Sequence, residues 1–126
     1  MNRRELLRTA IGSTALAATA YAAKAADIKI TGLEVFSVHI NKRGNWVLFR
    51  VRTDAGLTGI GDASHGGRDS QVVELGRKLL ETVRGRGIFD VEFLRKQGVS
   101  LVRGGARSAA VALGGLEQAL WDLQGQ

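Results

Sequence analysis

The chain has 126 residues, which is enough for one domain of ordinary size and too few for two. Hydrophobic residues make up 44% and charged residues 24%, a balance typical of soluble globular proteins rather than of disordered or membrane-spanning ones. The chain contains no cysteine, which excludes disulfides, thiolate metal sites and cysteine nucleophiles, and its formal net charge is +6.

Residues 1–25 differ from the rest of the chain and predict an export signal peptide. A basic start is followed by a mildly apolar run and by the small-x-small pattern of a signal peptidase site, Ala23-Lys24-Ala25. The run is shorter than the roughly 20 residues that span a bilayer. The paired arginines in Asn2-Arg3-Arg4-Glu5-Leu6-Leu7-Arg8 resemble the twin-arginine export motif, from which Asn2 and Leu6 depart. We therefore expect a periplasmic protein, cleaved after Ala25 and free of the membrane afterwards; an ordinary amphipathic N-terminal helix is the alternative.

Removal of this segment halves the net charge, because it carries +3 of the total. The basic residues that remain are scattered, and no aromatic ladder is interleaved with them, so the sequence does not favour a nucleic-acid surface. We expect these residues to be solvated charges on the edges of strands and helices.

Three strands are predicted first in the remaining chain. Ile28 to Ile40 is rich in β-branched and aromatic residues, and a slip in its apolar alternation at Gly32 predicts a β-bulge. A polar turn over residues 41–45 leads to the clearest strand, Trp46 to Thr53. The short turn Asp54-Ala55-Gly56 then returns the chain into a third strand, Leu57 to Ala63. This spacing predicts an antiparallel meander.

From Asp69 onward the apolar period changes from two to about 3.6 residues, which predicts helices. Asp69 or Ser70 is expected to cap the first helix, which Gly85 ends and whose apolar stripe is Val72, Gly76, Leu79, Leu80 and Val83. Asp90 is expected to cap a short second helix that carries Val91 and Leu94 and ends near Gly98. The third helix is predicted from Arg107 to Gly125. Strands followed by a bundle of about three helices define an α+β fold.

The glycines of the stretch Gly56 to Gly61 do not indicate a phosphate loop, because they lie in a hairpin and lack the lysine of a P-loop. Gly59 and Gly61 are better explained by close backbone approach or bulging in the third strand.

Few side chains suggest catalysis or metal binding. The two histidines, His39 and His65, lie in no recognisable metal-binding pattern, and Ser64 next to His65 lacks the acidic member of a triad. His65 lies near Arg68 on a glycine-rich loop, which suits contact with an anionic ligand, although a solvated loop histidine is the commoner case. The carboxylates of Glu117 and Asp122 are five positions apart and therefore on different faces of a helix, which favours structural roles.

Two segments together resemble the mandelate racemase/muconate lactonizing enzyme group. Residues 46–64, WVLFRVRTDAGLTGIGDAS, resemble the pattern "vrv.TD.G..G.GEa", with Asp62 in place of the usual glutamate. Residues 109–125, which end in EQALWDLQG, are similar to "A.e.ALWDl.Gk". The resemblance extends over about residues 28–126, although the proline common in the family after the helical segment is missing here.

The resemblance implies that residues 26–126 form the N-terminal capping domain of an enolase-superfamily enzyme. Such an enzyme would pair this domain with a (β/α)-barrel that supplies three carboxylates for Mg²⁺ and the bases that abstract a proton α to a carboxylate. The chain itself would then hold no catalytic residue, no metal ligand and no cofactor. Its contribution would be two loops over a small carboxylate or acid-sugar substrate, Asn41–Trp46 and Ser64–Asp69, with these candidate contact residues: Asn41, Lys42, Arg43, Asn45, Trp46, Ser64, His65 and Arg68.

The last predicted helix carries the apolar stripe Leu113, Leu116, Leu120 and Leu123, and no further element follows it. We expect three strands and two helices to cover this stripe only in part, so that the isolated chain lacks a partner and is either poorly soluble or self-associates through this helix into a homo-oligomer. The leading interpretation is a substrate-capping domain of a racemase, cycloisomerase or sugar-acid dehydratase, truncated before its barrel or encoded apart from it. The alternatives are an exported carboxylate-binding module and a non-functional gene fragment.

Overall fold

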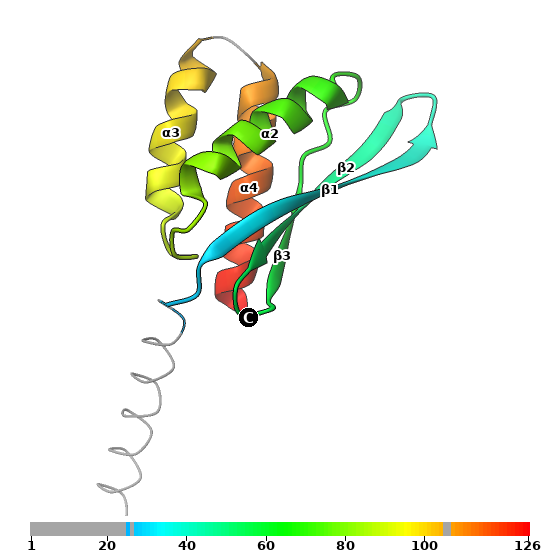
Figure 1. Ribbon diagram of the computed structural model, residues 1–126. Helices are drawn as coiled ribbons and strands as arrows, with labels where there is room; N and C mark the ends of the chain where they lie inside the picture. The colour runs from blue at the N-terminus through cyan, green and yellow to red at the C-terminus, as the bar shows by residue number, and fades with distance from the viewer. Residues whose placement is uncertain (1–24, 26, 105–106) are drawn as a thin grey trace, which may run out of the picture.

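The computed structural model describes residues 25, 27–104 and 107–126 (Figure 1). The predicted signal peptide lies outside these residues except for Ala25. The sheet comes first and the helices follow, in the order β1 (Ile30–Asn41), β2 (Gly44–Thr53), β3 (Thr58–Asp62), α2 (Asp69–Val83), α3 (Val91–Arg103) and α4 (Arg107–Gly125). This order confirms the predicted α+β fold.

The three strands form an antiparallel sheet in the order β1-β2-β3, which confirms the meander. The register between β1 and β2 shifts between Ile30 and Gly32, where a bulge was predicted, and shifts again near the tip between His39 and Asn41. Strand β1 begins two positions later than the sequence predicts. The reason is that Ile28 is bound outside the sheet, where its carbonyl accepts from the Ile88 N–H at 3.2 Å.

The beginning of α2 differs from the prediction. Arg68 occupies the N-cap position and no side chain caps the helix, whereas Asp69 is its first residue. The carboxylate of Asp69 is used elsewhere, because it accepts a hydrogen bond from Asn45. Gly85, with φ of 81°, follows the end of the helix as expected.

Helix α3 is longer than predicted, and the expected stop near Gly98 is wrong. The helix runs on to Arg103, and Gly98 lies inside it where α3 packs against α4. A Cβ at position 98 would lie 2.6 Å from a methyl carbon of Leu113. The glycine therefore allows close packing between the two helices rather than ending the first one.

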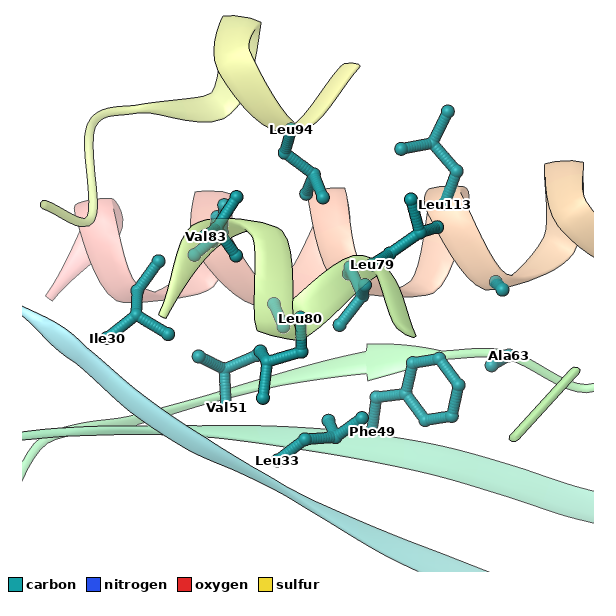
Figure 2. Close-up of a cluster of buried hydrophobic side chains, with 14 of the residues drawn as sticks. Ile30, Leu33, Phe49, Val51, Ala63, Leu79, Leu80, Val83, Leu94 and Leu113 are labelled. Atoms are coloured by element: carbon teal, nitrogen blue, oxygen red, sulfur yellow. The ribbon is translucent and has the colours of Figure 1, made fainter. Parts of the chain in front are cut away.

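The helices lie on one side of the sheet, where α2 and α4 pack against the strands and α3 packs against α2 and α4, and the core lies between these elements (Figures 1 and 2). The side chains that fill it come from β1, β2 and the three helices, including Phe49 and Val51 of β2, Leu79 and Leu80 of α2 and Leu94 of α3. The far end of the β1–β2 hairpin extends beyond the helices. One side of the hairpin tip is therefore left open.

Helix α4 lies in the centre of the helical layer, in contact with β2, β3, α2 and α3. The prediction that its leucine stripe would be only partly covered is wrong: Leu113, Leu116, Leu120 and Leu123 are 9%, 1%, 1% and 2% exposed. The glycines of β3 make this possible. A Cβ on Gly59 would lie 2.1 Å from the Ala119 carbonyl oxygen and one on Gly61 would lie 1.8 Å from that of Gly115, which confirms the predicted close approach.

Candidate functional site

The two loops that the sequence singles out meet at the tip of the β1–β2 hairpin, around a pocket of about 290 Å³. We call this cavity the rim pocket. One wall comes from the β1–β2 turn and the other from the loop between β3 and α2. Its lining residues are Ile40, Asn41, Arg43, Gly44, Asn45, Trp46, Ser64, His65 and Gly66.

The first wall is shaped by a tight turn. The Arg43 N–H donates to the Asn41 side-chain oxygen at 2.8 Å, and Gly44 has a φ of 142° that disfavours any side chain. Trp46 follows at the start of β2 with 57% of its surface exposed. The turn thus places a guanidinium group, an amide and an indole around one opening.

The second wall is a short loop held at both ends. The Ser64 N–H donates to the Asp62 carboxylate at 2.8 Å, and Gly66 and Gly67 both have positive φ, at 76° and 143°. His65, which precedes these glycines, is half-buried. Its Nε2 atom is buried without a hydrogen-bond partner in the described part of the chain. This nitrogen is a polar group whose hydrogen-bonding capacity is unused.

Direct contacts join the two walls. The Val47 N–H donates to the Ser64 hydroxyl oxygen at 3.0 Å, and the Ala63 N–H donates to the Val47 carbonyl oxygen at 2.8 Å. The Asn45 amide donates to the Asp69 carboxylate at 3.2 Å. The rim pocket is therefore bounded by one continuous set of contacts.

Six of the eight predicted contact residues line the rim pocket, whereas Lys42 and Arg68 do not. Both are exposed beside it. Whether any of the eight binds a substrate stays a prediction. Sequence reasoning missed Ile40, Gly44 and Gly66 as lining residues, although the two glycines follow the loop pattern already recognised there.

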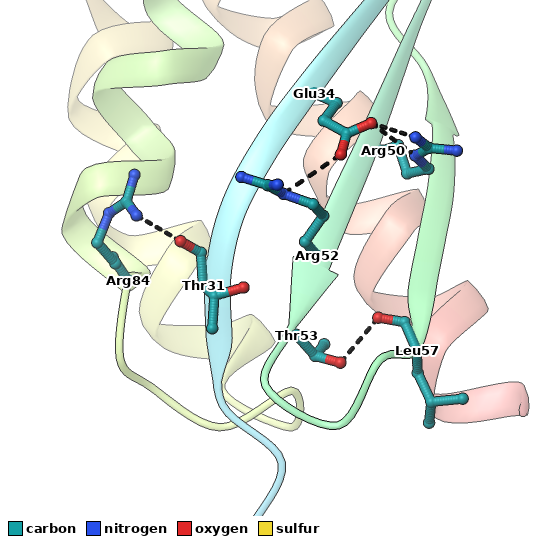
Figure 3. Close-up of polar contacts among 7 residues, drawn as sticks. All are labelled: Thr31, Glu34, Arg50, Arg52, Thr53, Leu57 and Arg84. Atoms are coloured by element: carbon teal, nitrogen blue, oxygen red, sulfur yellow. Dashed lines mark hydrogen bonds and ion pairs between the residues drawn. The ribbon is translucent and has the colours of Figure 1, made fainter.

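Arg43 is the cation of the rim pocket, and it forms no ion pair within the described residues. Other basic residues have structural partners. On the outer face of the sheet, Glu34 pairs with Arg50 and, at 3.4 Å, with Arg52 (Figure 3). The Arg84 guanidinium donates to the Thr31 carbonyl oxygen and to Glu81, and the ion pair raises the pKa of Arg84. Arg43 is thus free to meet an anion.

The two carboxylates of α4 have structural roles, as predicted. Glu117 accepts from Arg95 of α3 at 3.1 Å, and this pair raises the pKa of Arg95. Asp122 accepts from the backbone N–H of Ile60 in β3 at 2.9 Å. Neither carboxylate lies in the rim pocket.

The described residues show no group of three or more His, Cys, Asp or Glu side chains that could hold a metal ion. Among the helices in this part of the chain, none is both long and apolar enough to cross a bilayer.

Comparison with known proteins matches this fold and its loops to one family. Residues 29–126 match the N-terminal domain of mandelate racemase/muconate lactonizing enzyme. A D-galactonate dehydratase family member of Paenibacillus sp. (strain JDR-2) is 34% identical in an alignment of 103 residues that covers 78% of this chain and 24% of that protein. A D-mannonate dehydratase of Caulobacter vibrioides is 35% identical in an alignment of 88 residues that covers 65% of this chain and 21% of that protein.

The same fold occurs in the crystal structure of a member of the enolase superfamily from Salmonella Typhimurium. That structure aligns with a TM-score of 0.69 at 23% identity and covers 78% of this chain and 26% of the other chain. The chain spans about a quarter of the length of the curated relatives that it matches. Because residues 29–126 match this domain, the chain belongs to the mandelate racemase/muconate lactonizing enzyme family as an N-terminal domain.

Proposed function

We propose that residues 26–126 act as the substrate-capping and specificity domain of an enzyme that abstracts a proton α to a carboxylate. The observation that carries this proposal is the rim pocket, because two loops distant in sequence converge there with an unpaired guanidinium, an amide, an indole and an unsatisfied imidazole nitrogen. Such a mixture of polar donors and an aromatic surface suits a small hydroxylated carboxylate. The similarity to two sugar-acid dehydratases favours a dehydratase over a racemase or cycloisomerase.

The metal chemistry of this reaction would lie outside the chain. In a family enzyme, a bound Mg²⁺ would supply electrostatic stabilisation of the negative charge left by proton abstraction. The described residues do not fit a metal site, since they bring no suitable carboxylates together. We therefore assign the metal ligands and the catalytic bases to a barrel domain, either continuous with this chain in a longer protein or encoded separately, and assign substrate enclosure to the rim pocket.

A domain exchange tests this proposal. The segment of the Caulobacter D-mannonate dehydratase that matches this chain is replaced by the matching residues of the chain, and kcat/KM is measured over a panel of sugar acids. We expect the order of preference to change, and we expect Arg43→Ala in the chimera to raise KM for the best acid. A second chimera, in which only residues 41–46 and 64–69 are exchanged, should show the same change. Retention of the host preference in both chimeras would contradict the proposal.

The closed core favours a second candidate, a carboxylate-binding module that works without a barrel. All four leucines of the α4 stripe are covered within the chain, so the domain has a hydrophobic core of its own. Calorimetry of the chain alone with the same sugar acids separates the two candidates. A dissociation constant well below 1 mM, which corresponds to roughly 4 kcal/mol, would support the module. Binding seen only in the presence of a barrel would support the capping domain.

We also propose that the protein is exported to the periplasm by its N-terminal segment. The support is the ordered basic, apolar and small-x-small pattern of residues 1–25.

A further inference from the structure

The side chain of Asn45 lies between the two walls of the rim pocket and contacts one residue of β1 and one of α2. Its Oδ1 atom lies 2.9 Å from Nδ1 of His39 in β1, and its Nδ2 atom lies 3.2 Å from Oδ2 of Asp69 in α2. One amide thus connects the hairpin to the first residue of a helix that follows 24 positions later.

The chemistry of these groups determines which atom donates in each contact. A carboxylate oxygen accepts, so the Asn45 amide nitrogen must face Asp69, and the Asn45 oxygen is then left to accept from His39. The Nδ1 atom of His39 therefore carries the proton of that bond. Asparagine is suited to this position because it offers a donor at one end and an acceptor at the other.

The partial burial of Asp69 gives this amide a particular importance. In the described residues, its Oδ1 atom is buried without a hydrogen-bond partner, and the bond from Asn45 is the one hydrogen bond that its side chain receives. A buried carboxylate without hydrogen bonds is costly. Loss of the Asn45 donor would therefore favour a rearrangement that returns Asp69 to water and separates the two walls.

The turn and the loop also approach each other next to Asn45. Gly44 packs closely against Gly66, because a Cβ on Gly44 would lie 3.2 Å from the Gly66 Cα atom. The Ser64 hydroxyl accepts from Val47 further along. The two walls thus meet through several contacts, and Asn45 supplies the one between the turn and Asp69.

We propose that Asn45 is a positioning residue that couples the turn at residues 41–45 to the loop at residues 64–68, so that the rim pocket opens and closes as one unit. The consequence of this coupling for substrate binding rests on the proposed function: a bound acid would be enclosed by two segments that move together rather than independently. The coupling itself is a property of this chain and needs no barrel.

The experiment compares backbone order parameters, measured by NMR relaxation on the 126-residue chain, in both segments. Asn45→Asp keeps the acceptor toward His39 and removes the donor toward Asp69. We expect it to lower the order parameters of residues 42–45 and 64–68 together, from about 0.85 to below about 0.6. The matched control is Asn41→Asp in the same turn, which keeps the oxygen that accepts from Arg43. It should leave residues 64–68 unchanged.

A charge-conserving exchange keeps the test decisive even if Asn45→Asp destabilises the whole chain. In the double variant Asn45→Asp with Asp69→Asn, the donor and the acceptor trade places, and the bond between the two positions can form again. We expect this variant to restore order in both segments. The proposal is overturned if Asn45→Asp loosens residues 42–45 alone, or if the double variant restores nothing. Neither result depends on substrate, so a failed domain exchange would leave this test intact.

Discussion

At the residue scale, two side chains of α4 bind the outer edge of β3. Asp122 accepts from the Ile60 N–H at 2.9 Å and the Gln118 oxygen accepts from the Asp62 N–H at 3.0 Å. These N–H groups point away from β2, and no further strand of the described residues lies beside β3. The aspartate of the sequence EQALWDLQG thus has a structural role, because it accepts a hydrogen bond from the backbone N–H of a residue 62 positions earlier in the chain.

We expect Asp122→Ala to lower the free energy of unfolding by about 0.5–1.5 kcal/mol, because it removes the acceptor of the Ile60 N–H at an exposed edge. Asp122→Asn keeps an acceptor oxygen and should cost less than half as much. Urea denaturation followed by circular dichroism measures both values. Equal losses for the two variants would show that charge, not the hydrogen bond, is what matters.

Adjacent glycines in α4 should respond in opposite directions to the same substitution. A Cβ on Gly114 meets nothing within 4 Å, whereas one on Gly115 would lie 2.9 Å from the Ala63 Cβ and 3.2 Å from Phe49. We expect Gly114→Ala to stabilise the chain by about 0.5–1 kcal/mol through its helix propensity.

Gly115→Ala should destabilise the chain by roughly 1–3 kcal/mol, because it overpacks the contact between α4 and the sheet. Thermal melts of the two variants against the parent chain check both signs. Stabilisation by both substitutions would mean that α4 can move away from the sheet at little cost.

At the element scale, sequence patterns predict what depends on local chemistry. The strands, the turn at residues 41–45 and the span of α4 follow from alternation, turn residues and helical period, and so does the position of both rim loops. The length of α3 could not be predicted, because Gly98 looks like a helix end unless Leu113 is known to lie against it. The contact of Asn45 with Asp69 depends on how the sheet positions the hairpin against α2, which no local pattern contains.

The buried stripe of α4 changes what a lysine would do there. Since Leu120 is 1% exposed, Leu120→Lys places a charge in the core and should abolish cooperative folding rather than improve solubility. Leu120→Ala should cost about 2–5 kcal/mol. Leu101→Lys in α3 is the control, because that side chain is 38% exposed and should change stability by no more than about 0.5 kcal/mol. A soluble, folded Leu120→Lys chain would support the uncovered stripe that the sequence suggests.

The end of α2 should weaken in acid. The hydrogen bond from Arg84, followed by its charge, lowers the pKa of Glu81 below its usual 4.5. A pKa lowered by folding contributes stability above the unfolded value, and this is lost as pH falls through the folded value. The Tm difference between the parent chain and Glu81→Gln should therefore be present at neutral pH and shrink below pH 4.5. A difference that persists in strong acid would assign the effect to packing.

At the scale of the whole molecule, export and folding involve different parts of the chain. The signal segment is predicted from residues 1–25, while the fully buried core of the described residues begins at Ile30, with Ile28 packed against it. Cleavage after Ala25 would therefore leave the fold intact.

We expect the secreted protein to begin at Ala26 and Arg3→Lys with Arg4→Lys to block its export, since a twin-arginine signal needs the guanidinium pair. N-terminal sequencing and cell fractionation measure this. A general secretory signal would tolerate the change because it needs only positive charge, and a cytoplasmic product that retains Met1 would rule out export altogether.

The two side chains that α4 places on β3 also limit how these molecules can aggregate. An open sheet has two edges, and each can template a strand from another molecule. The β3 edge is occupied by Asp122 and Gln118, and the start of β1 is bound by the segment after α2, where Ile30 donates to the Arg86 carbonyl oxygen at 2.8 Å. In the described structure, only the outer stretch of β1 remains available. A sheet with one available edge can pair with the sheet of only one other molecule. Strand addition to the native fold therefore ends at a dimer and cannot propagate into a fibre.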